Sequence, residues 1–370
     1  MRIAILGTKG IPNNYGGFEQ FAEYISVRLV ERGHDVTVYN PRFHPFTGSS
    51  FKGVNIVKIF SPEAILGGAA NFIYDHLCLR HALADKYDII YEAGYHSVAL
   101  SYRLLGVKNI KRPILLTNMD GLEWKRSKWS RVTQTFIKKL ERMAVEDSPY
   151  LISDNKGIQN YYLKDFKRDS FFIPYGADHM GEIDQASLKK YAVNPYNYLI
   201  LVARLEPENN IEPIIEGYLQ SASNLPLIVV GNYKTTYGGK LKKMYPSVAF
   251  VGGIYDKSEL DALRHYSMAY FHGHSVGGTN PSLLEAMACR CFIIAHNNEF
   301  NRSVLEESAL YFGNSTEVKH LIETIAELRE RKYAEFDREN FNKINNQYNW
   351  NTVVTQHEEL FAELLKEKEK

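Results

Sequence analysis

The 370-residue sequence contains only three cysteines, Cys78, Cys289 and Cys291. They are too few and too irregularly spaced for a disulfide framework, so we expect buried thiols in a reducing compartment, with a metal or redox role for Cys289 and Cys291 less favoured. No apolar run approaches the roughly 18 residues of a membrane-spanning helix. The formal net charge of +1 lacks the basic excess that is typical of nucleic-acid-binding proteins, so we expect no nucleic-acid partner.

The first residues, MRIAILGTKG, indicate a strand rather than a secretory signal, because the apolar run is short and ends at Gly7. We therefore expect a cytoplasmic protein, with association at the inner face of a membrane still open. The length and the 45% content of hydrophobic residues predict about two globular domains.

Apolar strand-like runs alternate with helical patterns along the whole chain. In the first half these runs are RIAILG, DVTVYN, VNIVKIF, YDIIYEAG, PILLTNMDG, YLISDN and SFFIPYG, and in the second half NYLILVARL, LPLIVVGN, VAFVGG, MAYFHGH and CFIIAHN. Such alternation predicts an α/β protein with two doubly wound, Rossmann-like domains that face a central crevice. The predicted domains are residues 1–178 and 179–345, with a helix in 346–370 that crosses back to the first domain.

The stretch TKGIPNNYGGFEQF, residues 8–21, is a glycine-rich loop between a strand and a helix. Backbone N–H groups at a helix start favour an anion, so a nucleotide phosphate is one interpretation. A plain turn with positive φ at Gly16 or Gly17 is the alternative. A dinucleotide site is disfavoured, because the loop is long and the next strand ends in Asn40 rather than an acidic residue.

Two stretches of the second half also follow strands and begin helices. In VARLEPENN, residues 202–210, Arg204 is placed to bind an anion with its forked guanidinium, unless it pairs with Glu206 or Glu208. In HSVGGTNPSLLEAMA, residues 274–288, the glycines precede a helix start that can bind a diphosphate. The carboxylate of Glu285 suits a ribose diol better than a phosphate.

These motifs, in this order, resemble those of the GT-B fold retaining glycosyltransferases of family 4. The resemblance covers nearly the whole chain, with IPYGAD at the domain junction. It extends to a bacterial polysaccharide-assembly subgroup that includes rhamnosyltransferases, through ILGTKGIP, NYGGFE, NMDGLEWKRSKW, VARLEPENN and HSVGGTNPSLLEAMA.

The resemblance implies roles for individual residues. Arg204 and the backbone amides of Gly278, Thr279 and Asn280 would bind the donor diphosphate, and Glu285 the ribose. The other implied positions are Gly16 and Gly17 beside the diphosphate, Ile254 beside the base, and Asp120, which would stabilise positive charge at the anomeric carbon. His96 and Glu123 are expected on the acceptor side.

Two positions depart from the family pattern. Asn209 stands where a second phosphate-binding cation, a lysine, is usual, and Gly277 where a glutamate usually contacts the donor sugar. We keep both positions in the expected donor site. Lys234 and His274 are candidates for the compensating contacts.

The segment 124–142 has seven Lys or Arg against one acidic residue across 125–142. With its interleaved aromatic residues it suits an anionic lipid surface and a lipid-linked acceptor, while a solvated basic helix face is the alternative. We expect no metal and no cofactor, since HGH at 272–274 lacks a third ligand in the sequence.

The sequence thus predicts a retaining glycosyltransferase that moves a sugar from a nucleoside diphosphate to a saccharide or lipid-linked saccharide in bacterial surface polysaccharide synthesis. The subgroup suggests a deoxyhexose donor such as dTDP-L-rhamnose, and the implied mechanism is front-face displacement. The alternatives are a GT-B-fold nucleotide-sugar epimerase and a non-catalytic nucleotide-sugar-binding subunit.

Overall fold

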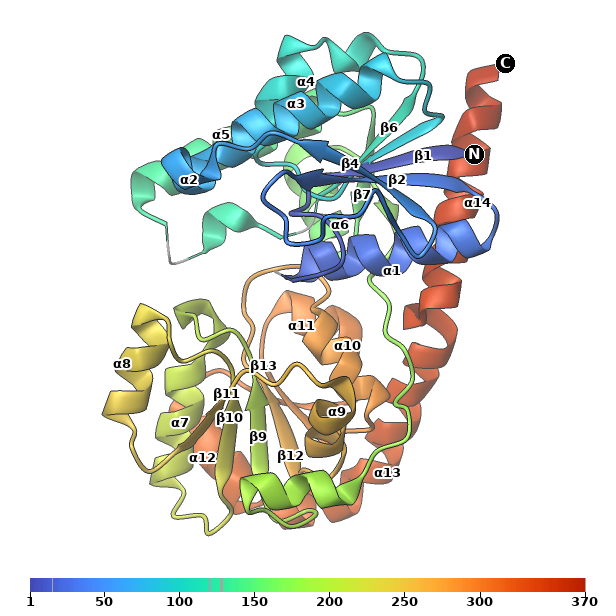
Figure 1. Cartoon of the computed structure of the whole chain (residues 1–370). Helices are drawn as coiled ribbons and strands as arrows, with labels where there is room; N and C mark the ends of the chain where they lie inside the picture. The colour runs from blue at the N-terminus through green and yellow to red at the C-terminus, as the bar shows by residue number, and fades with distance from the viewer. Residues whose placement is uncertain (15, 120, 127–128, 370) are drawn as a thin grey trace. The chain divides into compact units, whose positions relative to one another are not determined.

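The computed structural model describes residues 1–14, 16–119, 121–126 and 129–369. Its contacts divide the chain into two compact units. The first unit comprises residues 1–124, 129–175 and 350–370, and the second comprises residues 125–128 and 176–349. Each unit is a sheet with helices on both faces (Figure 1).

The sheet of the first unit has eight strands in the order β3-β4-β2-β1-β5-β6-β7-β8. All neighbours are parallel except β3, which is antiparallel to β4. The strands are β1 (Arg2–Leu6), β2 (Asp35–Pro41), β3 (Ser50–Phe51), β4 (Val54–Ile59), β5 (Ile89–Glu92), β6 (Ile114–Asn118), β7 (Tyr150–Ser153) and β8 (Phe171–Phe172). The strand order reverses between β1 and β5, so the loops after these two strands diverge.

Helices α3, α4 and α5 cover one face of this sheet and α1 the other (Figure 1). The helical segments are α1 (Gly17–Glu31), α2 (Glu63–Leu66), η1 (Gly67–Ala69), α3 (Ala70–Ala84), α4 (Ala99–Leu104), η2 (Val107–Asn109), η3 (Glu123–Lys125), α5 (Arg131–Asp147), α6 (Lys156–Phe166) and α14 (Trp350–Glu369). The C-terminal α14 packs on α1, where Trp350 stacks on Tyr24 at 5.0 Å between ring centroids and Glu358 binds Arg32 and His34. These contacts join the end of the chain to the first unit.

The second unit has six parallel strands in the order β11-β10-β9-β12-β13-β14. They are β9 (Leu199–Val202), β10 (Leu227–Val230), β11 (Ala249–Gly252), β12 (Ala269–His272), β13 (Ile293–His296) and β14 (Leu310–Phe312). The helical segments are η4 (Gln185–Tyr191), η5 (Pro207–Asn209), α7 (Ile211–Gln220), α8 (Thr236–Met244), α9 (Lys257–His265), α10 (Pro281–Ala288), α11 (Glu299–Leu305), α12 (Ser315–Glu323), α13 (Ile325–Lys343) and η6 (Ile344–Tyr348). Here the strand order reverses between β9 and β12.

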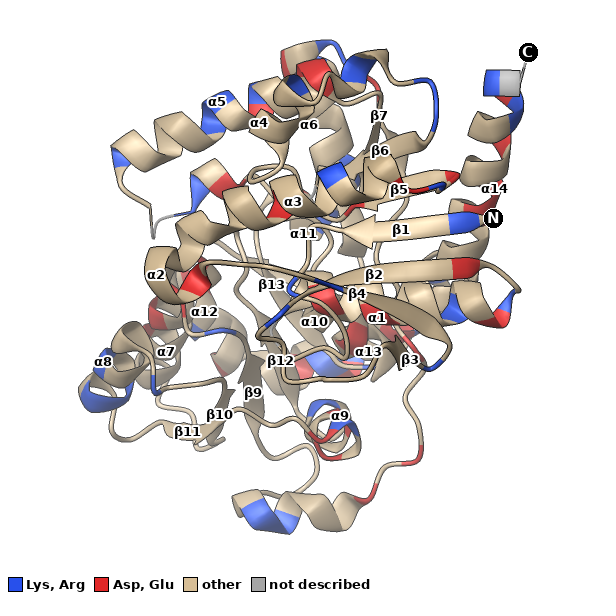
Figure 2. Ribbon diagram, turned by 45° about the horizontal axis from the view of Figure 1, so that its top comes forward, with Lys and Arg blue, Asp and Glu red and all other residues tan. Residues whose placement is uncertain are grey.

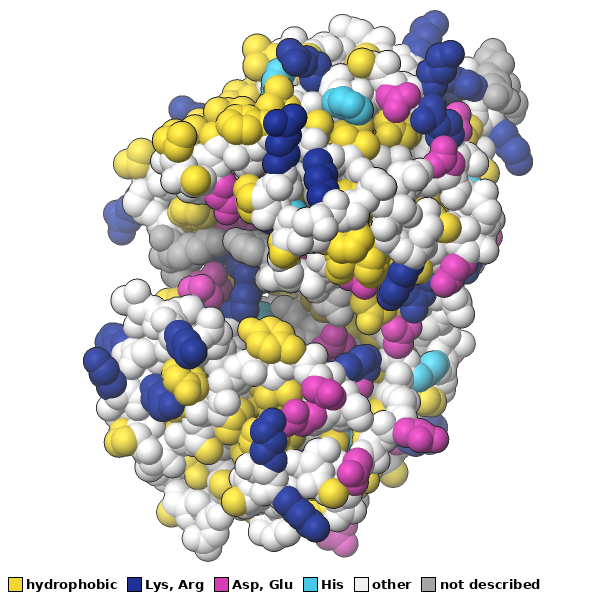
Figure 3. Space-filling model, in the orientation of Figure 1, with side chains coloured by type: hydrophobic (Ala, Val, Ile, Leu, Met, Phe, Trp, Pro, Cys, Tyr) yellow, Lys and Arg dark blue, Asp and Glu magenta, His cyan; other side chains and the backbone are white. Residues whose placement is uncertain are grey.

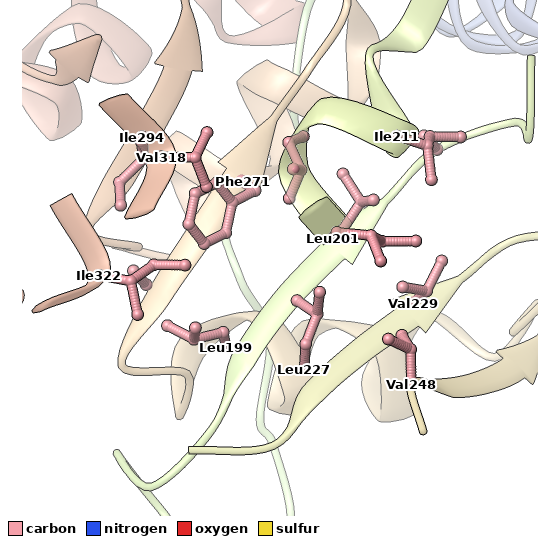
Figure 4. Close-up of a cluster of buried hydrophobic side chains, with 14 of the residues drawn as sticks. Leu199, Leu201, Ile211, Leu227, Val229, Val248, Phe271, Ile294, Val318 and Ile322 are labelled. Carbon is pink, nitrogen blue, oxygen red and sulfur yellow. The ribbon is translucent and has the colours of Figure 1, made fainter. Parts of the chain in front are cut away.

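The core of the second unit explains why its strand ends are held rigidly. Leu199 and Leu201 of β9 and Phe271 of β12 pack against Ile211 and Val318 from the covering helices (Figure 4). Replacing such a buried leucine by alanine typically costs about 2–5 kcal/mol, because a cavity remains in a close-packed interior. The loops at the carboxyl ends of β9 and β12 therefore begin from well-anchored strands.

The structure confirms the predicted α/β class with two parallel, doubly wound sheets. The sequence pattern did not reveal β3 and β14, which have only two and three residues. All three cysteines are free and buried, as expected. Among the described residues, no helix is both long and apolar enough to span a membrane.

Candidate functional site

The predicted donor-binding residues of the second unit gather at one edge of its sheet. Because all six strands are parallel, the segments that follow them begin at the same edge. The segments after β9 and β12, residues 203–210 and 273–280, flank the point where the strand order reverses. Ligands of open α/β sheets bind at such a point.

The segment after β9 is held by its own side chains. The side-chain amide of Asn209 donates to the carbonyl of Arg204 at 2.7 Å, and the amide of Asn210 donates to the carbonyl of Gly273 at 2.7 Å. Asn209 is buried, whereas Arg204 is exposed. The side chain of Asn209 thus stabilises the loop that carries Arg204, and its predicted contact with the donor stays a prediction.

The segment after β12 leads directly into α10. The Oδ1 atom of Asn280 accepts from the N–H of Ser282 at 2.9 Å, which caps the helix, and Pro281 occupies the first turn. Thr279 is buried beside this cap. The start of α10 carries the partial positive charge that favours an anion, which suits the diphosphate role predicted for Gly278, Thr279 and Asn280.

Gly277 has φ = 128°, outside the range that side chains readily adopt. A Cβ atom there would meet no neighbour within 4 Å. The backbone conformation, rather than crowding, therefore favours glycine at this position.

Glu285 on α10 is held by a charge network that the sequence did not indicate. Its carboxylate lies 2.6 Å from the guanidinium of Arg264, which also contacts Asp261 and Ser282, each at 3.3 Å. Burial alone would lower the pKa of Arg264, but the Glu285 carboxylate and the other anionic neighbours outweigh it and raise this pKa. The glutamate is partly exposed and the arginine fully buried. One side of the carboxylate is thus anchored in the protein interior.

Two histidines stack after β12. The rings of His272 and His274 are 4.4 Å apart and nearly parallel. Burial, followed by the positive charges of Arg204 and Arg126, lowers the pKa of His274 to about 3. His274 is therefore neutral at physiological pH, and its carbonyl is fixed by the side-chain amides of Asn298 and Asn301.

Arg126 is a further cation of the second unit. Its guanidinium lies 3.5 Å from the carboxylate of Glu208, between Pro207 and Asn209 in η5. The hydroxyl of Ser275 donates to the Glu208 carbonyl at 2.7 Å, which ties η5 to the segment after β12. The sequence places Arg126 in the predicted lipid-facing segment 124–142. In the structure it lies beside the loop of Arg204.

Lys234 and Ile254 lie in the segments after β10 and β11, respectively. Lys234 is exposed, and its backbone N–H donates to Asn232 at 2.9 Å. Ile254 is partly buried behind Gly252, which has φ = 88°. Both positions are thus at the same edge as Arg204.

In the first unit, Gly16 precedes α1 as its N-cap residue and Gly17 begins the helix. Gly16 is extended, with φ = −171°, and the glycines with positive φ in this region are Gly7 and Gly10. The alternative of a turn with positive φ at Gly16 or Gly17 is therefore wrong.

The loop before α1 is braced by side chains. Lys9 N–H donates to Glu19 at 2.7 Å, and Asn13 N–H donates to Glu23 at 2.7 Å. Asn40, whose position argued against a dinucleotide site, is buried and binds both the N–H and the carbonyl of Ile11.

The predicted acceptor-side residues occupy two other places in the first unit. His96 follows β5 and is partly buried beside Tyr95. Glu123 lies in η3 and accepts from the indole N–H of Trp129 at 3.0 Å. Asp120 lies outside the described residues.

Two buried carboxyl groups of the first unit, Glu92 and Asp75, were not predicted from the sequence. Glu92 ends β5 under the Gly7 turn, and neither of its carboxyl oxygens has a hydrogen-bond partner in the part of the chain that the structure describes. Burial raises its pKa well above the usual value and raises that of Asp75 to about 6. The only sequence signal was an acidic residue at the end of an apolar strand.

No group of three or more His, Cys, Asp or Glu side chains is arranged to hold a metal ion within residues 1–14, 16–119, 121–126 and 129–369. The histidines of HGH therefore have no described partners for a three-ligand site.

Family models match both halves of the chain. Residues 1–178 match a family described as "Domain of unknown function (DUF1972)", and residues 184–347 match the family "Glycosyl transferases group 1". No curated protein matches the chain in sequence.

Solved structures of similar fold include two with a TM-score of 0.75. Sucrose-phosphate synthase from Thermosynechococcus elongatus is 16% identical, with 99% of each chain covered. Anabaena Alr3699/HepE in complex with UDP-glucose is also 16% identical, with 98% of this chain and 100% of the other covered. The two parallel-sheet units match GT-B structures, and with residues 184–347 matching the group 1 family, the chain is a glycosyltransferase of the GT-B fold.

Proposed function

We propose that this glycosyltransferase retains the anomeric configuration and transfers a sugar from a nucleoside diphosphate to a hydroxyl of a growing saccharide. The proposed setting is bacterial surface polysaccharide synthesis, at the inner face of the membrane. The observation that carries the proposal is the grouping of Arg204, the capped start of α10 and the anchored Glu285 at the switch point of one parallel sheet.

Each of these parts suits one portion of a nucleotide sugar. The amides at the start of α10 and the guanidinium of Arg204 neutralise the diphosphate without a metal ion. Glu285 accepts from ribose hydroxyls, and Ile254 contacts the base. Lys234 and the neutral His274 face the sugar end, where Gly277 leaves open space.

In the proposed front-face displacement, the diphosphate leaves on the same side from which the acceptor hydroxyl attacks. The bond between the anomeric carbon and the phosphate oxygen breaks as the new glycosidic bond forms, and the departing phosphate oxygen takes the acceptor proton. Arg204 and the helix start stabilise the charge that grows on the leaving diphosphate. The helix start is held in place by its Asn280 cap before the reaction, so this part of the site needs little reorganisation.

Two observations support the proposed identity of the donor. The structural neighbour HepE is described in complexes with UDP and UDP-glucose, which supports a nucleoside diphosphate sugar as the donor. The altered position at Gly277 favours a sugar other than glucose, and we propose a deoxyhexose such as rhamnose. The proposed acceptor is a saccharide or lipid-linked saccharide.

The direct test measures release of nucleoside diphosphate from UDP-glucose, dTDP-L-rhamnose and related donors, with and without saccharide acceptors. We expect release that depends on an acceptor. Arg204→Ala and Glu285→Ala should each lower this turnover by about tenfold or more, because each removes a charge-assisted contact worth about 1.5–3 kcal/mol.

Matched controls are Arg331→Ala and Glu327→Ala, which alter an exposed ion pair on α13. The controls should keep full turnover. An epimerase would instead convert the donor without any acceptor. Unchanged turnover in Arg204→Ala and Glu285→Ala would contradict the assigned site.

A further inference from the structure

Exposed apolar side chains gather on one part of the first unit. Ile65 is 84% exposed and Val132 is 81% exposed, and Leu66, Ile73 and Phe136 are each more than two-fifths exposed. Figure 3 shows hydrophobic side chains collected over α2 and α3. We call these five residues the apolar surface. Soluble proteins rarely leave large contiguous apolar areas in water unless the area binds something.

The sequence explains why α2 and η1 contribute to this surface. Residues 64–70 read AILGGAA, without a charged or hydrogen-bonding side chain, and residues 64–69 are exposed in succession. A single short helical turn cannot fold this apolar stretch back onto the sheet. The stretch therefore projects from the start of α3 instead of joining the core.

The helix α5 contributes a second apolar stripe. Val132 and Phe136 are four residues apart and share its outer face, while Ile137 and Leu140 are buried on the inner face. The ring of Phe136 lies 6.2 Å from that of Phe72 on α3. This contact connects the α5 stripe to the residues of α3.

The exposed charged side chains of α5 beside the apolar surface are positive. The exposed cations of α5 are Arg131, Lys138, Lys139 and Arg142. Figure 2 shows segments of Lys and Arg along this helix. The acidic residue among them, Glu141, is buried and accepts from Trp124, Tyr161 and Tyr162. The side chain that borders α2, Glu63, is ion-paired with Lys9. The outer rim of the apolar surface is therefore basic.

We propose that the apolar surface and its basic rim dock on an anionic phospholipid bilayer. A group of exposed apolar side chains bordered by Lys and Arg is typical of surfaces that lie in the membrane interface, where the apolar side chains enter the acyl boundary and the cations contact lipid phosphates. The inference deepens the lipid-side part of the proposed function, and it assigns the contact chiefly to α2, α3 and α5 rather than to the whole of residues 124–142.

The test is co-sedimentation of the full chain with vesicles of phosphatidylglycerol and phosphatidylcholine, and with vesicles of phosphatidylcholine alone. We expect binding to the anionic vesicles that weakens at high salt. The double variant Ile65→Ser/Val132→Ser should lose most of this binding. Lys139→Gln/Arg142→Gln should weaken it by on the order of fivefold for each cation removed.

The matched control is Leu163→Ser, which changes an exposed leucine on α6 of the same unit and should bind vesicles like the wild type. Ile65 and Val132 are almost fully exposed, so their replacement should leave the melting temperature unchanged. Equal sedimentation of the wild type and Ile65→Ser/Val132→Ser would overturn the proposal. A protein dimer that this double variant dissociates would also overturn it, because the occupant would then be a second copy.

Measuring sugar transfer in solution, without vesicles, tests the proposed function separately from the proposed membrane contact. If the wild-type protein transfers sugar to a water-soluble acceptor but does not bind anionic vesicles, only the proposal of a membrane-docking surface is refuted. Protein that binds the vesicles through Ile65 and Val132 but releases no nucleoside diphosphate from any donor refutes only the proposed reaction.

Discussion

Arg264 forms an ion pair with Glu285. Its guanidinium is buried and lies 2.6 Å from the carboxylate of Glu285, whose side chain is 25% exposed. Arg264 also contacts Asp261 and Ser282, and Ser282 is hydrogen-bonded to the Tyr270 hydroxyl at 2.7 Å. A carboxylate fixed in this way has fewer orientations to lose when it binds a diol. Arg264 is therefore a positioning residue for the proposed ribose contact.

Replacing Arg264 by Met should weaken nucleoside diphosphate binding by about tenfold and reduce the preference for ribose over deoxyribose nucleotides, for instance UDP over dUDP. Removal of one partner from a buried ion pair should also lower the free energy of unfolding by about 3–5 kcal/mol. Calorimetric titration of UDP and dUDP measures the first effect and urea unfolding the second. In a double-mutant cycle with Glu285→Ala, additive losses in binding would show that Arg264 does not act through Glu285.

Arg126 should contribute to binding of the diphosphate through its place beside the loop of Arg204. It supplies a positive charge near Asn209, the position where the family resemblance leads us to expect a lysine. Arg126→Gln should therefore weaken binding of a nucleoside diphosphate by about tenfold and that of the bare nucleoside much less. Arg131→Gln, an exposed change at the start of α5, is the control and should bind both as the wild type does. A similar loss for nucleoside and nucleoside diphosphate would argue against a phosphate contact.

Gly277→Ala should destabilise the second unit by about 1–3 kcal/mol, because an alanine at φ = 128° is strained although its Cβ has space. Gly277→Glu, which introduces the side chain expected from the family resemblance, should show the same loss and no gain in turnover with UDP-glucose. Thermal unfolding and donor turnover measure the two effects. Gly181→Ala is a suitable control, since its Cβ also has open space and its φ is not positive. A Gly277→Glu variant that keeps wild-type stability would show that the loop accepts a side chain.

Glu92 should make stability depend on pH. Burial raises its pKa in the folded state, so the carboxyl group stays protonated there, while in the unfolded chain it ionises near pH 4.3. Its stabilising contribution is complete below that pH and is lost as the pH rises toward the folded-state pKa. Asp75, with a pKa of about 6, adds to the loss between about pH 4 and 6.

Glu92→Gln removes the titration and keeps a similar shape. The variant should gain stability relative to the wild type by about 1.4 kcal/mol for each pH unit above about 4.3, until the folded-state pKa is reached. Urea unfolding at several pH values measures this difference. Glu327→Gln, on the exposed face of α13, serves as the control and should follow the wild-type curve. Parallel curves for the wild type and Glu92→Gln would contradict the assignment.

The places of several candidate residues in the fold were predictable from local chemistry. Glycines that follow strands, Pro281 at a helix start and Arg204 at a strand end are each indicated by a few neighbouring residues. The hydrogen bond from the Asn209 amide to the carbonyl of Arg204 was not predictable, because it depends on the loop conformation. Arg264 was overlooked because it is 21 residues from Glu285 in sequence.

The sequence by itself determined the alternation of apolar strands and amphipathic helices, and hence two doubly wound sheets, since each run either buries its apolar face or remains unfolded. Only the tertiary structure decided the strand order that brings the segments of Arg204 and Gly278 together. It also paired Arg264 with Glu285, placed Arg126 beside Glu208 and left Ile65 and Val132 in solvent. The physical reason is that burial and ion pairing depend on which segments contact each other in the folded protein. Contacts between residues far apart in sequence cannot be predicted from the local sequence around either one.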